Sequence, residues 1–160
     1  MVNQEQRTLN NVYYAKCGYT QESGKGQHYS VYLALKQLDS VTFAAGLEIY
    51  KLDYELFEER RQLVKVMSLY LEGVSGYRET LHAALKIVLS KLERNASICV
   101  KGTQLDTLSK YFYKDEELIN AIHANNMFLS FRHIKGTMRV ELACLLQDAA
   151  ERKSSVIANI

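Results

Sequence analysis

Residues 18–26 end in Gly24-Lys25-Gly26, which is similar to a loop that binds nucleotide phosphates. Such a loop requires the spacing G-x4-G-K-[ST], because its backbone N–H groups form a cradle of fixed length and its hydroxyl group binds magnesium. Here the spacing is one residue too long, and Gly26 stands in place of the hydroxyl residue. The pattern favours a polar surface loop, and a phosphate-binding enzyme is the least favoured of three functional hypotheses.

Glu79 and His82 are one helical turn apart, which is the spacing found in di-iron helix bundles. A di-iron site requires a second Glu-x-x-His pair and two further glutamates that point inward. The nearest second copy has Asn120 where glutamate is required before His123. We therefore favour a solvated helix pair. The sequence predicts no catalytic residue, metal site or cofactor, and it predicts a protein that is not an enzyme.

Residues 125–139 combine amide, basic and aromatic side chains in one short stretch, NNMFLSFRHIKGTMR. Asparagine, arginine and lysine are the side chains that contact base edges and phosphates in nucleic acids. The stretch follows two short segments with helix-capping signals, so a helix–turn–helix is one interpretation, although the turn lacks the small residues typical of that motif. A solvated loop is the other interpretation.

The elements that must position these residues are predicted to be helical. Proline is absent, which favours helices because proline breaks helix interiors. Apolar residues between Val31 and Tyr70 recur at alternating spacings of four and three, which is typical of a heptad seam. The fold class is therefore predicted as all-α, a helical bundle with one very long helix over about residues 31–72, or about 60 Å at 1.5 Å per residue.

A second apolar line repeats every seventh residue beside that seam and includes Tyr50, Phe57 and Val64. A helix with two adjacent apolar lines buries more than one face, and a chain of this length has few elements to cover both. We therefore predict a homodimer with these three residues at or near its interface. Residues 1–75 form the arm and the long helix, and residues 76–160 form a second helical region, within one compact domain.

Shorter helices are predicted after residue 76. One begins at Tyr77, and Thr103 and Asp106 have the spacing of a capping box that would begin another. Asp115 is expected to cap a further helix that breaks at Asn125-Asn126, and a last helical region follows Phe128. The short apolar segment around Cys99 is a buried connector or strand.

Composition restricts the class of protein. The net charge of +2 is nearly balanced, so a contact with nucleic acid requires a local patch of the folded chain. The three cysteines are widely spaced, which argues against a disulfide framework and a zinc motif. The N-terminus lacks the apolar core of a signal peptide, and no apolar run is long enough to span a bilayer. The expected location is the cytoplasm.

The second half of the chain carries a series of short motifs in a fixed order. A leucine-rich helix beginning at Tyr77 is followed by Asn-Ala-Ser-Ile-Cys-Val-Lys-Gly at 95–102, by capped helices, by Asn-Asn-Met-Phe-Leu-Ser-Phe-Arg at 125–132, and by Leu-Leu-Gln-Asp at 145–148. In this order and spacing, about half of the chain resembles the D subunit of the flagellar master transcription activator, whose diverged relatives activate conjugative-transfer genes. Residues 1–75 have no counterpart in this resemblance.

The resemblance implies an all-helical, intertwined dimer. It implies assembly with a larger, zinc-binding C-type subunit into a complex that activates promoters by recruiting RNA polymerase. The family positions implicated in activation correspond to Lys101 and Asn125, and the family's cysteine is replaced by Leu129, which excludes an intersubunit disulfide there.

The resulting functional prediction is a DNA-binding transcription activator subunit. It is expected to contact promoter DNA through five residues: Lys101, Asn125, Arg132, Lys135 and Arg139. A helical scaffold or adaptor that does not bind DNA is the alternative hypothesis.

Overall fold

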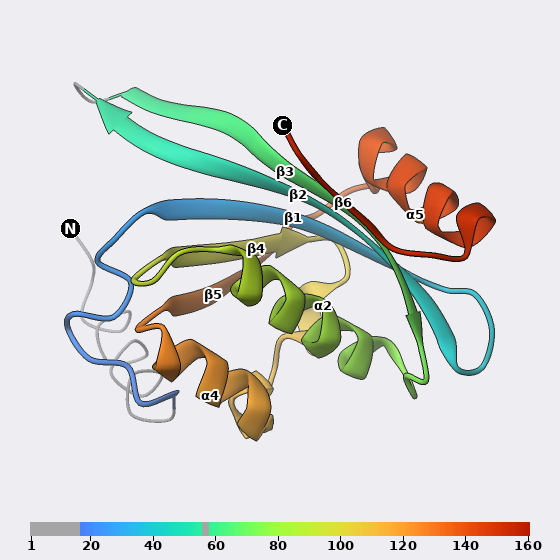
Figure 1. The fold of residues 1–160 in the computed structure, drawn as a ribbon, viewed down its shortest axis with the longest axis horizontal. Coiled ribbons are helices and arrows are strands. Elements are labelled where there is room, and N and C mark those ends of the chain that lie inside the picture. The colour runs from blue at the N-terminus through green and yellow to red at the C-terminus, as the bar shows by residue number, and fades with distance from the viewer. Residues whose placement is uncertain (1–16, 56–57) are drawn as a thin grey trace.

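A six-stranded mixed sheet with helices on both faces forms the molecule (Figure 1). The computed structural model describes residues 17–55 and 58–160. The strand order is β5-β4-β1-β2-β3-β6. Strands β1, β2 and β3 are antiparallel neighbours, whereas β4 and β5 run parallel to β1. The all-α prediction, including the intertwined helical dimer implied by the resemblance, is wrong for these residues.

The predicted long helix over residues 31–72 is replaced by three strands. They are β1 (His28–Gln37), β2 (Thr42–Glu55) and β3 (Glu58–Glu72). In β2, the apolar residues Phe43, Ala45, Leu47 and Ile49 are all buried and recur at every second position, as a strand requires. In a strand, a spacing of three joins residues on opposite faces, whereas a spacing of four joins residues on the same face. The alternating spacings that suggested a heptad seam therefore do not follow one face of these strands.

Small apolar residues on the second face explain why the alternation was hidden in the sequence. Ala34 and Ala44 fill the positions between the large core residues and are buried against helix α5 (Val140–Arg152). Because both faces are apolar at this end of the sheet, the period of two gives way to a nearly continuous apolar run. A bulge between Ile49 and Tyr50 shifts the register with β3 and further disturbs the pattern.

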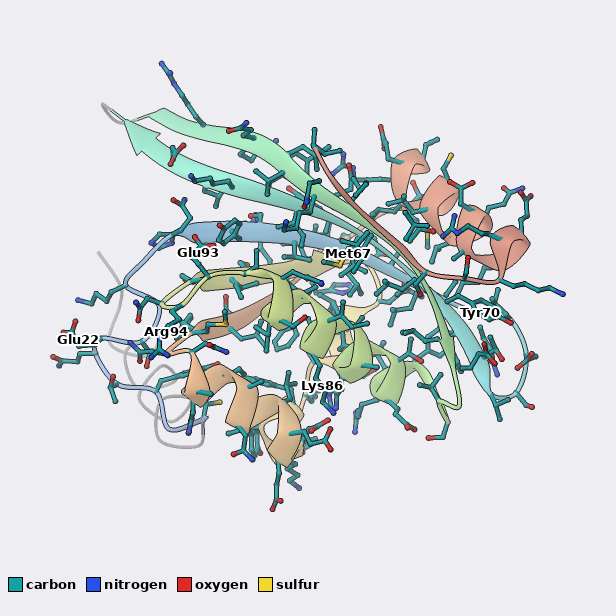
Figure 2. The ribbon with its side chains drawn as sticks, in the orientation of Figure 1. Glu22, Met67, Tyr70, Lys86, Glu93 and Arg94 are labelled. Carbon is teal, nitrogen blue, oxygen red and sulfur yellow. The ribbon has the colours of Figure 1, made fainter. Side chains whose placement is uncertain are left out.

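Helices α2 (Tyr77–Lys91) and α4 (Glu116–Ala124) lie on the opposite side of the sheet from α5 (Figure 1). Leu81, Leu85 and Val88 of α2 are fully buried in the main core, as their helical spacing predicted. The predicted start of α2 at Tyr77 is confirmed. Lys86 extends from α2 toward α4, where its Nζ lies 3.0 Å from Oε2 of Glu117 (Figure 2).

The capping predictions had mixed outcomes. Asp115 caps α4, since its Oδ1 accepts a hydrogen bond from the Leu118 N–H at 3.1 Å. The helix ends at Ala124 with Asn125 as its C-cap, in agreement with the break expected at Asn125-Asn126. The capping box at Thr103 does not form. The short helix α3 (Leu105–Leu108) has Gln104 at its N-cap without a side-chain cap, and this side chain instead bonds the backbone of Leu35.

Two segments in the second half of the chain form strands that run parallel to β1. Strand β4 (Ser97–Gly102) resolves the connector-or-strand alternative around Cys99. A 3-10 turn η1 (Phe112–Lys114) and α4 lead into β5 (Phe128–His133), where a helical region was expected. The chain then forms α5 and the edge strand β6 (Val156–Asn159), which pairs with β3.

Gly46 allows α5 to pack directly on the second face of the sheet. A Cβ atom at this position would lie 2.9 Å from the Leu142 carbonyl oxygen and 3.0 Å from the Leu145 Cβ atom. Leu142, Leu146 and Ala149 of α5 form a small second core there with Ala34 and other residues of the sheet. This helix covers only part of the second face.

The two predicted halves share one sheet, because β1 pairs with β4 across the boundary at residues 75 and 76. Of the three predicted dimer residues, Val64 packs against the main core, while Tyr50 contacts Tyr32 on the other face. Phe57 lies outside the described residues. The helical line that grouped these residues therefore does not exist. Among the described helices, none is both long enough and apolar enough to cross a membrane.

Candidate nucleic-acid interface

A row of polar and charged side chains crosses four neighbouring strands on the second face of the sheet. The backbone register pairs Glu48 of β2 with Tyr32 of β1, Tyr32 with Lys101 of β4, and Lys101 with Arg132 of β5. Residues in register on adjacent strands point to the same face of the sheet. The row therefore places two cations side by side, next to a tyrosine and a carboxylate.

Strand alternation explains why Lys101 and Arg132 share this face. In β4, Ile98 and Val100 are fully buried in the main core, so Lys101 points away from it. In β5, Leu129 is buried and Phe131 packs against the same core, so Arg132 also points away. Because β4 and β5 are parallel, both cations lie at the carboxyl ends of their strands, where ligands of α/β sheets commonly bind.

Tyr32 is the centre of a set of contacts with cations. The guanidinium carbon of Arg139 lies 4.9 Å from the centroid of the Tyr32 ring, and Nζ of Lys101 lies 5.6 Å from it. Arg61 donates a hydrogen bond of 2.8 Å to the Tyr32 hydroxyl. Tyr50 packs edge-on against Tyr32 with centroids 5.7 Å apart. Cation–π contacts and ring packing thus hold these cations in place over the sheet.

Glu48 supplies a nearly buried negative charge within this set. Its residue is 4% exposed, and its Oε1 lies 3.3 Å from Nη1 of Arg139. This contact is an ion pair without hydrogen-bond geometry, because Oε1 has no hydrogen-bond partner among the described residues. A hydrogen bond with Tyr50, together with the charges of Glu48 and Glu141, raises the pKa of Arg139 although burial opposes the shift. Arg139 is therefore largely neutralised by its carboxylate neighbours.

Lys101 and Arg132 differ from Arg139 because they have no such compensation. Within the part of the chain that the structure describes, no carboxylate lies within 4.0 Å of either cation. Like charges at directly opposed positions of neighbouring strands are destabilising. An uncompensated pair at the carboxyl ends of two parallel strands is suited to an anionic ligand such as a phosphate group.

A hollow of about 120 Å³ lies beside Lys101, between the middle of β1, the end of β4 and the start of α5. Tyr32, Lys101 and Arg139 line it together with residues of the loop after β5. Gly102 allows the close approach of β4 and β1 at its base, since a Cβ there would lie 2.7 Å from the Leu33 carbonyl oxygen. Lys101 thus belongs both to the lining of the hollow and to the pair of uncompensated cations.

The structure brings together some of the predicted DNA-binding residues and separates others. Lys101, Arg132 and Arg139 meet on the second face of the sheet, and Lys135 is exposed in the loop between β5 and α5. Asn125 lies elsewhere, at the C-cap of α4 before the first residue of β5, where its Nδ2 donates to the Ala121 carbonyl oxygen at 3.2 Å.

Sequence reasoning missed Tyr32, Glu48 and Arg61. All three fell within the predicted long helix, where they were assigned no role. A period of two over residues 28–37 would have placed Tyr32 on the face away from the core, but the burial of Ala34 on that face obscured this signal.

The Glu79-x-x-His82 motif, which was rejected as a metal site from the sequence, lies on α2, on the opposite side of the sheet from this face. Glu79 accepts hydrogen bonds from Ser75, and His82 Nδ1 lies 3.0 Å from Asp115 Oδ2 between α2 and α4. Within residues 17–55 and 58–160, no group of three or more histidine, cysteine, aspartate or glutamate side chains has an arrangement that could hold a metal ion.

The fold and this face together define a mixed α/β sheet protein with a cationic, tyrosine-containing surface. No family model matches the chain, and no curated protein matches it. Among solved structures, the chain is similar to a foamy viral protease–reverse transcriptase determined in complex with double-stranded DNA. The match has 9% sequence identity and a TM-score of 0.39, and it covers 79% of this chain and 94% of the other.

Proposed function

We propose that the protein is a non-enzymatic nucleic-acid-binding protein. Its binding surface is the cationic face, defined here as Tyr32, Arg61, Lys101, Arg132 and Arg139. The observation that carries the proposal is the uncompensated pair of Lys101 and Arg132 in register on parallel strands. Neutralisation by a phosphate would remove the like-charge repulsion that the free protein contains.

A phosphate backbone fits the extended shape of this face better than a single small anion does. The cations lie on three strands and directly before α5, with Arg61 on β3, Lys101 on β4, Arg132 on β5 and Arg139 at the N-cap of α5. Several phosphates along one strand of nucleic acid can contact such a row, and each contact releases counterions. The nearly balanced net charge of +2 leaves this local surface as the main electrostatic attraction.

The proposal retains the nucleic-acid contact expected from the sequence. The C-type partner and the promoter-activating complex followed from an all-helical resemblance, and the described fold is not helical. An intracellular location belongs to the proposal, because nucleic acid is available there and because Cys17, Cys99 and Cys144 are all free thiols.

The test is a binding titration with labelled oligonucleotides over a salt series from about 50 to 200 mM. The informative variant is Lys101→Ala combined with Arg132→Ala. We expect weaker binding and a slope of log K against log salt that is shallower by about one to two units, because two phosphate contacts are lost. The control is Lys91→Ala combined with Lys110→Ala, which removes two exposed lysines elsewhere. This control variant has the same net charge as the Lys101/Arg132 double variant.

Two results would overturn the proposal. One is an affinity of the Lys101/Arg132 double variant equal to that of the control. The other is equal binding of a polyglutamate peptide that carries the same charge as the oligonucleotide, which would assign the cationic face to an acidic protein partner.

A further inference from the structure

The hollow beside the cationic face has an apolar interior, which phosphate binding alone does not explain. Ile134, Met138 and Leu142 contribute aliphatic or thioether surface to its lining. Leu142 is 4% exposed, so it belongs to the packed interior of the protein. An apolar recess at a polar surface is suited to an apolar group of a ligand.

Polar residues also line the hollow. They are Lys101, Thr103, Thr137 and Arg139. The Tyr32 ring is also part of the lining. A ligand that fills the hollow must therefore combine a flat or compact apolar body with polar edges and a nearby negative charge. A nucleotide has this combination, because its base is flat and its phosphate is anionic.

The size of the hollow limits which base can enter. Its volume of about 120 Å³ is on the order of the ~150 Å³ engineered cavity that binds one benzene molecule. A single six-membered ring fits within this space, whereas two stacked bases or a fused double ring would extend out of it. The geometry therefore favours one pyrimidine over one purine.

Entry of a base into the hollow also favours a single strand of nucleic acid over a duplex. In a duplex, each base is stacked and paired, and moving it into a recess costs a few kcal/mol of unstacking and unpairing. An unpaired strand presents its bases without this cost.

We propose that the cationic face binds single-stranded nucleic acid and that the hollow accepts one unstacked pyrimidine base. This inference rests on the proposed function, since the phosphates next to that base contact Lys101 and Arg132. Binding of the base adds affinity that does not depend on salt, whereas binding of the phosphates sets the salt dependence.

The first experiment compares three short single strands of equal length with the unaltered protein: oligothymidylate, oligoadenylate and an abasic strand. The abasic strand keeps the phosphates and lacks the bases. We expect oligothymidylate to bind about tenfold more tightly than the abasic strand, with the same salt slope. Oligoadenylate and a duplex of the same length should bind less tightly than oligothymidylate.

The second experiment fills the hollow by Thr137→Trp. Thr137 is exposed and is one of the residues that line the hollow, so the larger side chain is compatible with folding. The variant should bind oligothymidylate only as tightly as the abasic strand, and its affinity for the abasic strand should be unchanged. The matched control is Thr107→Trp, an exposed threonine outside the hollow, which should leave all affinities unchanged.

The outcomes separate this inference from the proposed function. Equal binding of oligothymidylate and the abasic strand would overturn the base site and leave phosphate binding by the cationic face in place. Equal binding of oligothymidylate and oligoadenylate would overturn the pyrimidine preference. The absence of binding to any strand at low salt would overturn both the inference and the proposed function.

Discussion

The guanidinium of Arg139 and the carboxylate of Glu48 form an ion pair of 3.3 Å in which the carboxylate is nearly buried. Glu48 is in the middle of β2, and Arg139 directly precedes α5. The pair thus connects the sheet to the helix that covers part of its second face. It also fixes one cation of the cationic face beside Tyr32.

Removing Arg139 alone should destabilise the protein more than removing both charges of this pair. Arg139→Ala leaves the Glu48 carboxylate buried without its charge partner, and we expect the free energy of unfolding to fall by about 1–3 kcal/mol. Combining it with Glu48→Gln should recover part of that loss, because the unpaired charge is removed. Urea unfolding of the two single variants and the double variant measures this coupling.

The control for the ion pair is Arg132→Ala, which removes an exposed cation without a described carboxylate partner. Its free energy of unfolding should stay within about 0.5 kcal/mol of the unaltered protein. A double variant that is destabilised by the sum of the two single effects would show that Arg139 and Glu48 do not interact.

Gly46 should be essential for the packing of α5. In Gly46→Ala, the new methyl group meets the Leu142 carbonyl oxygen at 2.9 Å, so the helix must shift or the strand must distort. We expect a loss of about 1–3 kcal/mol in the free energy of unfolding and weaker oligonucleotide binding, because Arg139 moves with α5. Thermal unfolding and the binding titration measure the two effects.

Gly76→Ala is the comparison for Gly46→Ala. Nothing lies within 4 Å of a Cβ atom at Gly76, and its backbone is extended with φ 172°. The expected loss is below about 1 kcal/mol, with unchanged binding. Equal effects of the two substitutions would show that close packing of α5 on Gly46 does not contribute to stability.

His82 should make stability depend on pH below neutrality. Burial lowers the pKa of this histidine, and the charges of Lys86 and Arg78 act in the same direction, while Asp115 opposes them. The folded state therefore binds fewer protons than the unfolded state between the lowered pKa and about 6.5. The free energy of unfolding should fall as the pH falls below about 6.5.

Urea unfolding from about pH 7 to 5 measures this effect. In His82→Gln, the part of the pH dependence that arises from this side chain should disappear, whereas His133→Gln changes an exposed histidine and should retain it. A His82→Gln profile parallel to that of the unaltered protein would contradict the assignment.

Asp115 should stabilise α4 through its cap. Asp115→Ala removes the acceptor for the Leu118 N–H and should cost about 0.5–2 kcal/mol of unfolding free energy. Asp115→Asn keeps an oxygen acceptor but loses the charge beside Lys86, so it should cost less. Chemical denaturation distinguishes the two variants, and equal losses would mean that the charge, not the cap, supplies the stabilisation.

Local signals in the sequence determined the helices that begin at Tyr77 and after Asp115. Leu81, Leu85 and Val88 follow a helical period and enter one core, and Asp115 caps the next helix through a hydrogen bond to a residue three positions away. These features could be predicted because the interacting groups are close in sequence. The same holds for the basic content of residues 132–139.

Tertiary structure alone decided the sheet and the cationic face. The strands over residues 28–72 are stabilised by pairing between distant segments, and small apolar residues such as Ala34 and Gly46 under α5 concealed their period of two. Lys101 and Arg132 are 31 positions apart, and only the parallel pairing of β4 with β5 places them side by side. Their proximity arises from hydrogen bonds between strands, which depend on how the whole chain folds rather than on the residues near each cation.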